Sequence, residues 1–231
     1  MIKDKQIWIF KEARAGSTWF CEALSKKINR NGHHYESVNY RKIKGYDDAI
    51  RLFKQEAHDL RDLNVFYATH YLPLMEYVNL LNKNTILIRL TRRDRTEHCL
   101  CILAFNMFGR TNNTHVFVNP INMLGNKEDS TSFYDEPKYV TKQQVKKIMQ
   151  GFKEKDYFWN TYSKNYVRSL VVYEDLEKGV NIEPLEINMK FSDDTSYTKK
   201  NPDYKKEAFV NYDQIVEWCN EYEKKFELDK H

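Results

Sequence analysis

Short apolar runs rich in β-branched and aromatic residues alternate along this chain with longer segments of helical periodicity. The clearest runs cover residues 6–10 and 85–90, and a third covers residues 168–173. Runs of this length and composition favour buried strands, and the intervening segments are long enough to cross from one parallel strand to the next. The sequence therefore predicts an α/β fold with a central, mostly parallel sheet flanked by helices.

Helical spacing is clearest directly after the first run. Ser17 and Thr18 are expected to cap a helix there, and the pair Asn31-Gly32 is expected to end it. Apolar side chains that share one face of this helix are Phe20, Cys21, Leu24 and Ile28. Further strands are predicted at 35–39 and 64–69, and further helices at 47–60, 73–81, 95–108, 141–152 and 204–226.

The composition is globular and limits the classes of ligand. The 231 residues are predicted to form one domain, 1–231, and no apolar stretch reaches the roughly 18 to 20 residues that cross a bilayer. The formal net charge of +4 suits an anionic small ligand and falls short of a dedicated nucleic-acid binder. The four cysteines and the pair His33-His34 show no metal-ligand spacing, so we expect reduced thiols, no metal site and a cytoplasmic location.

The segment between the first strand and the first helix carries the residues of an anion site. It contains Arg14, Gly16, Ser17 and Thr18, which supply a fixed cation, room for close backbone approach and two hydroxyl groups. The N–H groups and the dipole at a helix start attract anions, phosphate in particular. An ordinary helix N-terminus would also account for the two hydroxyls, and the spacing of a Walker A loop is missing.

The run Arg14-Ala-Gly-Ser-Thr-Trp-Phe-Cys-Glu-Ala-Leu24 resembles the 5′-phosphosulfate loop of sulfotransferases that use 3′-phosphoadenosine 5′-phosphosulfate (PAPS). Within that family the run is most similar to the bacterial carbohydrate sulfotransferases, although Ala13 stands where the family usually has Pro. The resemblance implies a sulfotransferase fold of the P-loop nucleotide-binding type. It also implies that the donor nucleotide is held by Arg14, Ala15, Gly16, Ser17, Thr18 and Trp19.

A second segment has the layout of the family's 3′-phosphate site, where an Arg after a central strand is followed eight residues later by Ser. Arg93 matches the arginine, and the serine position falls on Cys101. A thiol is a weaker hydrogen-bond donor than a hydroxyl, and the neighbouring Arg92 and Arg95 could compensate by charge. A solvated basic turn before a helix is the alternative interpretation of these arginines.

Two residues are candidates for the general base. His70, in Tyr67-Ala-Thr-His-Tyr-Leu-Pro73, resembles the catalytic histidine of cytosolic sulfotransferases and ranks first. Glu36 lies about where the bacterial carbohydrate enzymes have a glutamate base and ranks second. A lone histidine after a strand is also a common structural hydrogen-bond partner. The run Tyr173-Glu-Asp-Leu176 resembles the segment that closes a late strand in the family, with an architectural role.

The resemblance implies an enzyme that moves a sulfuryl group from PAPS to an acceptor hydroxyl or amine by in-line transfer, without a metal. Arg14 would stabilise charge on the leaving phosphate, and His70 or Glu36 would take the proton. The acceptor is expected to be a small molecule, a sugar or a lipid that binds at the segment 109–140. Two alternatives stay open: a nucleotide-binding module without catalysis, and a P-loop small-molecule kinase, for which the Walker lysine is missing. The sequence leaves the oligomeric state open.

Overall fold

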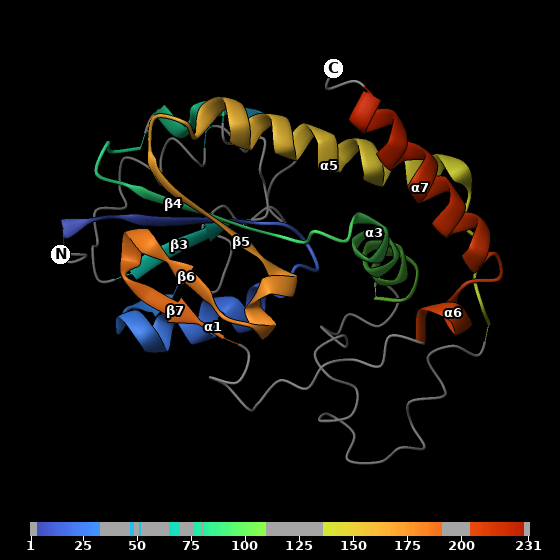
Figure 1. Cartoon of the computed structure of the whole chain (residues 1–231), viewed down its shortest axis with the longest axis horizontal. Coiled ribbons are helices and arrows are strands. Elements are labelled where there is room, and N and C mark those ends of the chain that lie inside the picture. Colours follow the sequence, from blue (N-terminus) through green and yellow to red (C-terminus); the bar gives the residue numbers. More distant parts are fainter. Residues whose placement is uncertain are drawn as a thin grey trace, which may run out of the picture. The chain divides into compact units, whose positions relative to one another are not determined.

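The computed structural model of this protein describes residues 4–32, 47–48, 51, 65–69, 76–79, 81–109, 136–190 and 204–228 (Figure 1). The chain forms two compact units, Met1–Arg93 with Glu154–Thr195 and Asp94–Lys153 with Ser196–His231. Three predicted features, Glu36, His70 and most of the segment 109–140, lie outside the described residues. The same holds for the predicted strand at 35–39 and most of the predicted helix at 47–60.

A parallel sheet in the order β2-β3-β1-β4-β5 forms the centre of the first unit (Figure 1). Its strands are β1 (Ile7–Lys11), β2 (Asn31–Gly32), β3 (Val65–Thr69), β4 (Ile86–Thr91) and β5 (Val167–Val172), and all four pairings are parallel. Figure 1 shows α1 (Ser17–Ile28) on one face of this sheet and the part of α5 (Lys142–Tyr162) that begins at Glu154 on the other. The predicted α/β fold, a parallel sheet flanked by helices, is therefore confirmed.

Four of the five strands, β1, β3, β4 and β5, are predicted to within one residue at each end, and burial explains this for the two central strands. Every residue of β1 and β4 is buried, because each strand has a neighbour on both sides and lies in the middle of the sheet. Both strands therefore appear in the sequence as apolar runs, which Arg89 interrupts in β4. β5 lies at the edge of the sheet, where Val167 and Leu170 are exposed while Val171 is buried.

Helix α1 differs from its prediction at both ends. Gly16 is the N-cap residue, in the left-handed backbone conformation with φ of 74°, and no side chain caps the helix. The prediction that Ser17 and Thr18 cap the helix is wrong, because both lie in its first turn. Asn29 follows the last helical residue with φ of 51°, a conformation that asparagine tolerates better than most residues. Asn31–Gly32 therefore does not end the helix and forms β2 instead.

A buried ion pair joins the carboxyl ends of β1 and β4. Glu12, the residue after β1, accepts hydrogen bonds from Arg89 Nε at 3.1 Å, from Arg89 Nη2 and from the Thr91 hydroxyl at 2.8 Å. The side chains of Glu12 and Arg89 are 0% and 3% exposed. Arg89 also donates to Asp156 of α5 at 2.5 Å. A buried carboxylate is tolerated when its charge is balanced and hydrogen bonded, and both conditions hold here.

Several short elements of the first unit have no counterpart in the sequence predictions. β6 (Val180–Ile182) and β7 (Ile187–Met189) form an antiparallel hairpin, and the 3₁₀ helix η7 (Tyr173–Glu177) follows β5. Strands of three residues are too short to show a period of two in the sequence. Of the predicted helix at 73–81, the structure describes residues 76–79, which form a 3₁₀ turn, and Leu81, which is not helical.

The second unit consists of helices around one apolar cluster. Its helices are α3 (Arg95–Ala104), continued by the π-helical segment η4 (Phe105–Gly109), the first part of α5, α6 (Tyr204–Ala208) and α7 (Tyr212–Leu228). Buried side chains of this cluster include Cys99, Leu103, Val145, Met149, Phe152, Ile215 and Cys219. No helix within the described ranges is long and apolar enough to cross a membrane.

Two helix starts in this unit confirm their predicted positions. Asp94 caps α3, where its carboxylate accepts the N–H of Glu97 at 2.7 Å. Thr141 precedes α5 and forms a reciprocal capping box with Gln144. The Thr141 N–H donates to the Gln144 side chain at 2.8 Å, and the Gln144 N–H donates to the Thr141 hydroxyl at 3.3 Å. Each start thus satisfies N–H groups that have no acceptor within the helix.

The single helix predicted at 204–226 is two helices, α6 and α7. Between them, Phe209 pairs with Lys138 in an isolated parallel bridge. The Asn211 side chain accepts the N–H of Val140 at 3.0 Å and donates to the carbonyl of Val140 at 2.9 Å. A segment distant in sequence thus holds residues 209–211 out of helical conformation. Local periodicity carries no signal for such a break.

The buried ion pair leads to a prediction about stability. Arg89→Met leaves the Glu12 carboxylate buried without its countercharge, so urea unfolding should show a loss of about 3–5 kcal/mol. The double variant with Glu12→Gln should recover most of that loss, because no charge is then left buried. Lys142→Met, which breaks the exposed Lys142–Glu221 pair, is the control and should change stability little. A wild-type unfolding midpoint for Arg89→Met would contradict a structural role for the pair.

Candidate anion-binding site

The order of the strands places a candidate ligand site at the carboxyl ends of β1 and β4. From β1 the chain continues to β2 and β3 on one side, and it then returns to β4 on the other side. In open parallel sheets, ligands bind outside the carboxyl ends of the strands where the order reverses in this way. The loop at residues 12–16 leaves the sheet at this point after β1. Residues 92–94 leave it after β4, and Thr91 lies in register with Val172 at the end of β5.

The loop after β1 has the strained backbone of a tight turn. The N–H of Glu12 still donates to the carbonyl of Leu90 at 3.0 Å, and the N–H of Ala15 turns back to the carbonyl of Glu12 at 3.2 Å. Arg14 and Gly16 both have positive φ, at 64° and 74°. Helix α1 begins directly afterwards, and the first turn of a helix directs its N–H groups and its positive dipole end outwards. The predicted order of strand, loop and helix is therefore present.

An aromatic ring from a distant segment packs against this loop. A Cβ atom built on Gly16 would lie 2.6 Å from Cε2 and 2.7 Å from Cδ2 of Tyr173, the first residue of η7. The ring thus occupies the space that any side chain at position 16 would need. From the sequence, Tyr173 is expected to have only an architectural role after a late strand. The structure instead brings it into contact with the candidate anion loop.

Arg92 connects the same ring to the end of β4. The guanidinium carbon of Arg92 lies 4.5 Å from the centroid of the Tyr173 ring, over its face. Arg92 Nε also donates to the Glu174 carboxylate at 3.2 Å. The three segments that follow β1, β4 and β5 therefore meet through Gly16, Tyr173 and Arg92. This convergence is the centre of the candidate site.

Arg93, the predicted 3′-phosphate ligand, lies beside this group and extends towards solvent. Its backbone N–H donates to the Glu174 carboxylate at 2.8 Å. Its Nη2 donates to both carboxylate oxygens of Asp175, at 2.8 and 2.6 Å. The hydrogen bond with Asp175 and the nearby negative charge raise the pKa of Arg93, so this arginine stays charged. The side chains of Arg93 and Asp175 are 64% and 40% exposed.

The remaining residues of the predicted nucleotide site fall in different places. Ala15 is fully buried, Ser17 is half-buried, and Trp19 is only 3% exposed, so its indole offers little surface to a ligand. Thr18 lies in the first turn of α1. Cys101 lies in α3, which belongs to the second unit.

Cys101 faces a charged pair within the second unit. Its sulfur lies 3.8 Å from Glu97 Oε1, and Glu97 pairs with Lys205 of α6. The Lys205 side chain is 4% exposed. Among the described residues, no group of three or more His, Cys, Asp or Glu side chains is placed to hold a metal ion.

The cysteines are free thiols, as predicted, and two of them are poor nucleophiles. Burial raises the pKa of Cys21 in α1 to about 11. A hydrogen bond with Cys219, together with burial, raises the pKa of Cys99. Thiolates rather than thiols attack electrophiles, so these environments disfavour covalent catalysis by Cys21 and Cys99.

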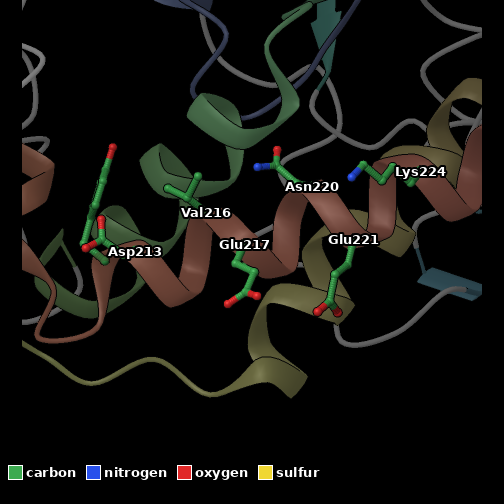
Figure 2. A pocket seen from close by; sticks show the side chains of 7 residues that line it. Asp213, Val216, Glu217, Asn220, Glu221 and Lys224 are labelled. Atoms are coloured by element: carbon green, nitrogen blue, oxygen red, sulfur yellow. The ribbon is translucent and has the colours of Figure 1, made fainter.

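The second unit has a surface hollow of about 580 Å³ along one side of α7 (Figure 2). Its lining residues are Tyr212, Asp213, Val216, Glu217, Asn220, Glu221 and Lys224. Lys142 holds Glu221 in an ion pair at 2.6 Å, and this hydrogen bond lowers the pKa of Glu221. None of the residues predicted from the sequence to bind or react lines the hollow.

Comparisons with protein-family models, with curated protein sequences and with solved structures returned no match for this chain. A function therefore has to be drawn from its residues and their geometry.

The contact between Gly16 and Tyr173 leads to a second prediction. Gly16→Ala adds a methyl group against the ring at a positive φ, so thermal or urea unfolding should show a loss of about 1–3 kcal/mol. Gly151→Ala is the matched control. A Cβ there meets nothing within 4 Å inside α5, and alanine should stabilise the helix by about 0.5–1 kcal/mol. Equal effects of the two substitutions would show that the ring does not restrict position 16.

Proposed function

We propose that this chain is a PAPS-dependent sulfotransferase, with a sulfotransferase fold of the P-loop type, that transfers a sulfuryl group to an acceptor hydroxyl or amine. The observation that carries the proposal is the convergence of Gly16, Tyr173 and Arg92 where the strand order of the sheet reverses. The run Arg14–Leu24, which resembles the phosphosulfate loop of these enzymes, forms the end of the loop after β1 and the first part of α1. Arginines and helix N–H groups are the donors that a phosphorylated nucleotide requires.

The proposed roles follow from where the residues lie. The N–H groups at the start of α1 would bind the phosphosulfate, and Arg14 would balance the charge that develops on the leaving 5′-phosphate. Arginine stays protonated, so Arg14 acts by its charge and donates no proton to the leaving group. The Tyr173 ring keeps the loop backbone in place, because it fills the space beside Gly16. Arg93 would bind the 3′-phosphate.

The reaction needs one further group that accepts a proton. PAPS supplies the sulfuryl group, whose bond to the bridging phosphate oxygen breaks as the bond to the acceptor oxygen or nitrogen forms. The base takes the acceptor's proton, and His70 ranks before Glu36 for this role. Positioning and charge stabilisation would supply the rest of the rate enhancement, as they do in phosphoryl transfer.

Calorimetry with adenosine 3′,5′-bisphosphate, the product nucleotide, tests the proposal directly. We expect binding with a Kd on the order of 1 μM and much weaker binding of ATP. Arg14→Gln should lower the affinity for the bisphosphate about tenfold or more, because it removes a charged donor from the loop. Lys164→Gln, which removes an exposed charge before the amino end of β5, is the control and should not lower it.

Three outcomes separate the alternatives. Equal or tighter binding of ATP would favour a small-molecule kinase and contradict the sulfotransferase proposal. Wild-type affinity in Arg14→Gln would show that the loop does not bind the nucleotide. Binding of the bisphosphate without sulfuryl transfer to any sugar, phenol, amine or lipid acceptor would favour a nucleotide-binding module.

The base is tested by turnover rather than by binding. His70→Ala should reduce the consumption of PAPS with a panel of acceptors by about 10²–10⁴-fold, while nucleotide affinity stays near that of the wild type. Glu36→Ala is the paired variant and should have a much smaller effect. The reverse order would make Glu36 the base, and two unchanged rates would reject both candidates.

A further inference from the structure

Two of the arginine–carboxylate pairs of the first unit differ sharply in their exposure. Arg89 and Glu12 are 3% and 0% exposed and hold β4 to β1, so this pair belongs to the framework of the fold. Arg93 and Asp175 are 64% and 40% exposed. Exposed ion pairs contribute little to the free energy of folding. Water stabilises the separate charges almost as well as the pairing does. The second pair therefore contributes little to the stability of the fold.

The geometry of this pair leaves the arginine able to exchange partners. The Arg93 backbone is held by the Glu174 carboxylate, which accepts its N–H at 2.8 Å, so the side chain starts from a fixed point at the carboxyl end of β4. Asp175 contacts only one guanidinium nitrogen, Nη2, with both of its oxygens. A guanidinium can donate through several N–H groups, and it matches phosphate oxygens in a two-point arrangement.

Asp175 does not need this contact to keep its own backbone in place. Its carbonyl accepts the N–H groups of Lys178 and Gly179, at 3.0 and 3.1 Å, and these bonds are independent of its side chain. Within the described residues, the Asp175 carboxylate contacts Arg93 alone. The carboxylate therefore accepts hydrogen bonds from the Arg93 guanidinium, as a bound anion would.

We propose that Asp175 is a built-in competitor that holds Arg93 until a phosphate group displaces it. The proposal rests on the proposed function, in which Arg93 binds the 3′-phosphate of the nucleotide. A phosphate monoester carries a charge of about −1.5 to −2 and three acceptor oxygens near neutral pH, against a single charge and two oxygens for a carboxylate. Asp175 thus reduces the affinity for every anion at Arg93, and a phosphate overcomes the competition better than a singly charged group does.

The test is Asp175→Asn, which keeps the size of the side chain and removes its charge. Calorimetry should show roughly three- to tenfold tighter binding of adenosine 3′,5′-bisphosphate, because the bound phosphate no longer displaces a carboxylate. Adenosine 5′-monophosphate, which lacks the 3′-phosphate, should bind with unchanged affinity. Glu177→Gln removes one charge from the same 3₁₀ helix without touching Arg93 and should leave both affinities unchanged.

A second variant shows whether the gain acts through Arg93. When Asp175→Asn is added to Arg93→Gln, the affinity for the bisphosphate should not increase, because the arginine for which the carboxylate competes is absent. An increase in affinity that persists in Arg93→Gln would overturn the proposal. An equal increase with the 5′-monophosphate, or in Glu177→Gln, would also overturn it, because the effect would then follow from the loss of any negative charge. Unchanged bisphosphate affinity in Asp175→Asn, with clear wild-type binding, would overturn it while leaving the proposed function intact.

Inorganic pyrophosphate separates the failure of this proposal from the failure of the proposed function. If neither protein binds the bisphosphate but Asp175→Asn binds pyrophosphate more tightly through Arg93, the competition stands and the proposed function is wrong. If neither protein binds either probe, both proposals fail together.

Discussion

The buried contact between Glu12 and Arg89 determines how the rest of the candidate site is arranged. It joins the carboxyl ends of the two central strands, and the Thr91 hydroxyl binds the same carboxylate oxygen. The loop at 12–16 begins at this glutamate, and Arg92 and Arg93 directly follow the threonine. Because the pair is buried and hydrogen bonded, the two segments leave the sheet at a fixed separation. A ligand that bridges them meets a preorganised surface, which lowers the entropy cost of binding.

Much of the fold could be predicted because its central elements are buried on both sides. β1 and β4 are fully buried, so most of their residues are apolar and their ends are predicted to within one residue. The capping box of Thr141 with Gln144 is equally local and was predictable. By contrast, the break between α6 and α7 depends on Asn211 binding Val140, and the hairpin β6-β7 is too short to show a period. Local patterns fail where a distant contact determines the backbone.

The candidate site divides in the same way. The loop after β1 was predictable from its glycine and its position between a strand and a helix, although Gly16 rather than Ser17 or Thr18 caps the helix. The contact of Tyr173 with this loop was not predictable, because the two segments are brought together only by the order of the strands. The same limit applies to the partner of Arg93, since a basic turn in the sequence does not show which carboxylate faces it.

The Tyr173 ring has a consequence for how this protein can change during evolution. One edge of the ring excludes every side chain larger than hydrogen at position 16, while its face carries the guanidinium of Arg92. A larger residue at position 16 requires a smaller one at 173, and a smaller residue there leaves Arg92 without its aromatic surface. Substitutions at positions 16, 92 and 173 are therefore structurally coupled, although these positions lie in three segments of the chain.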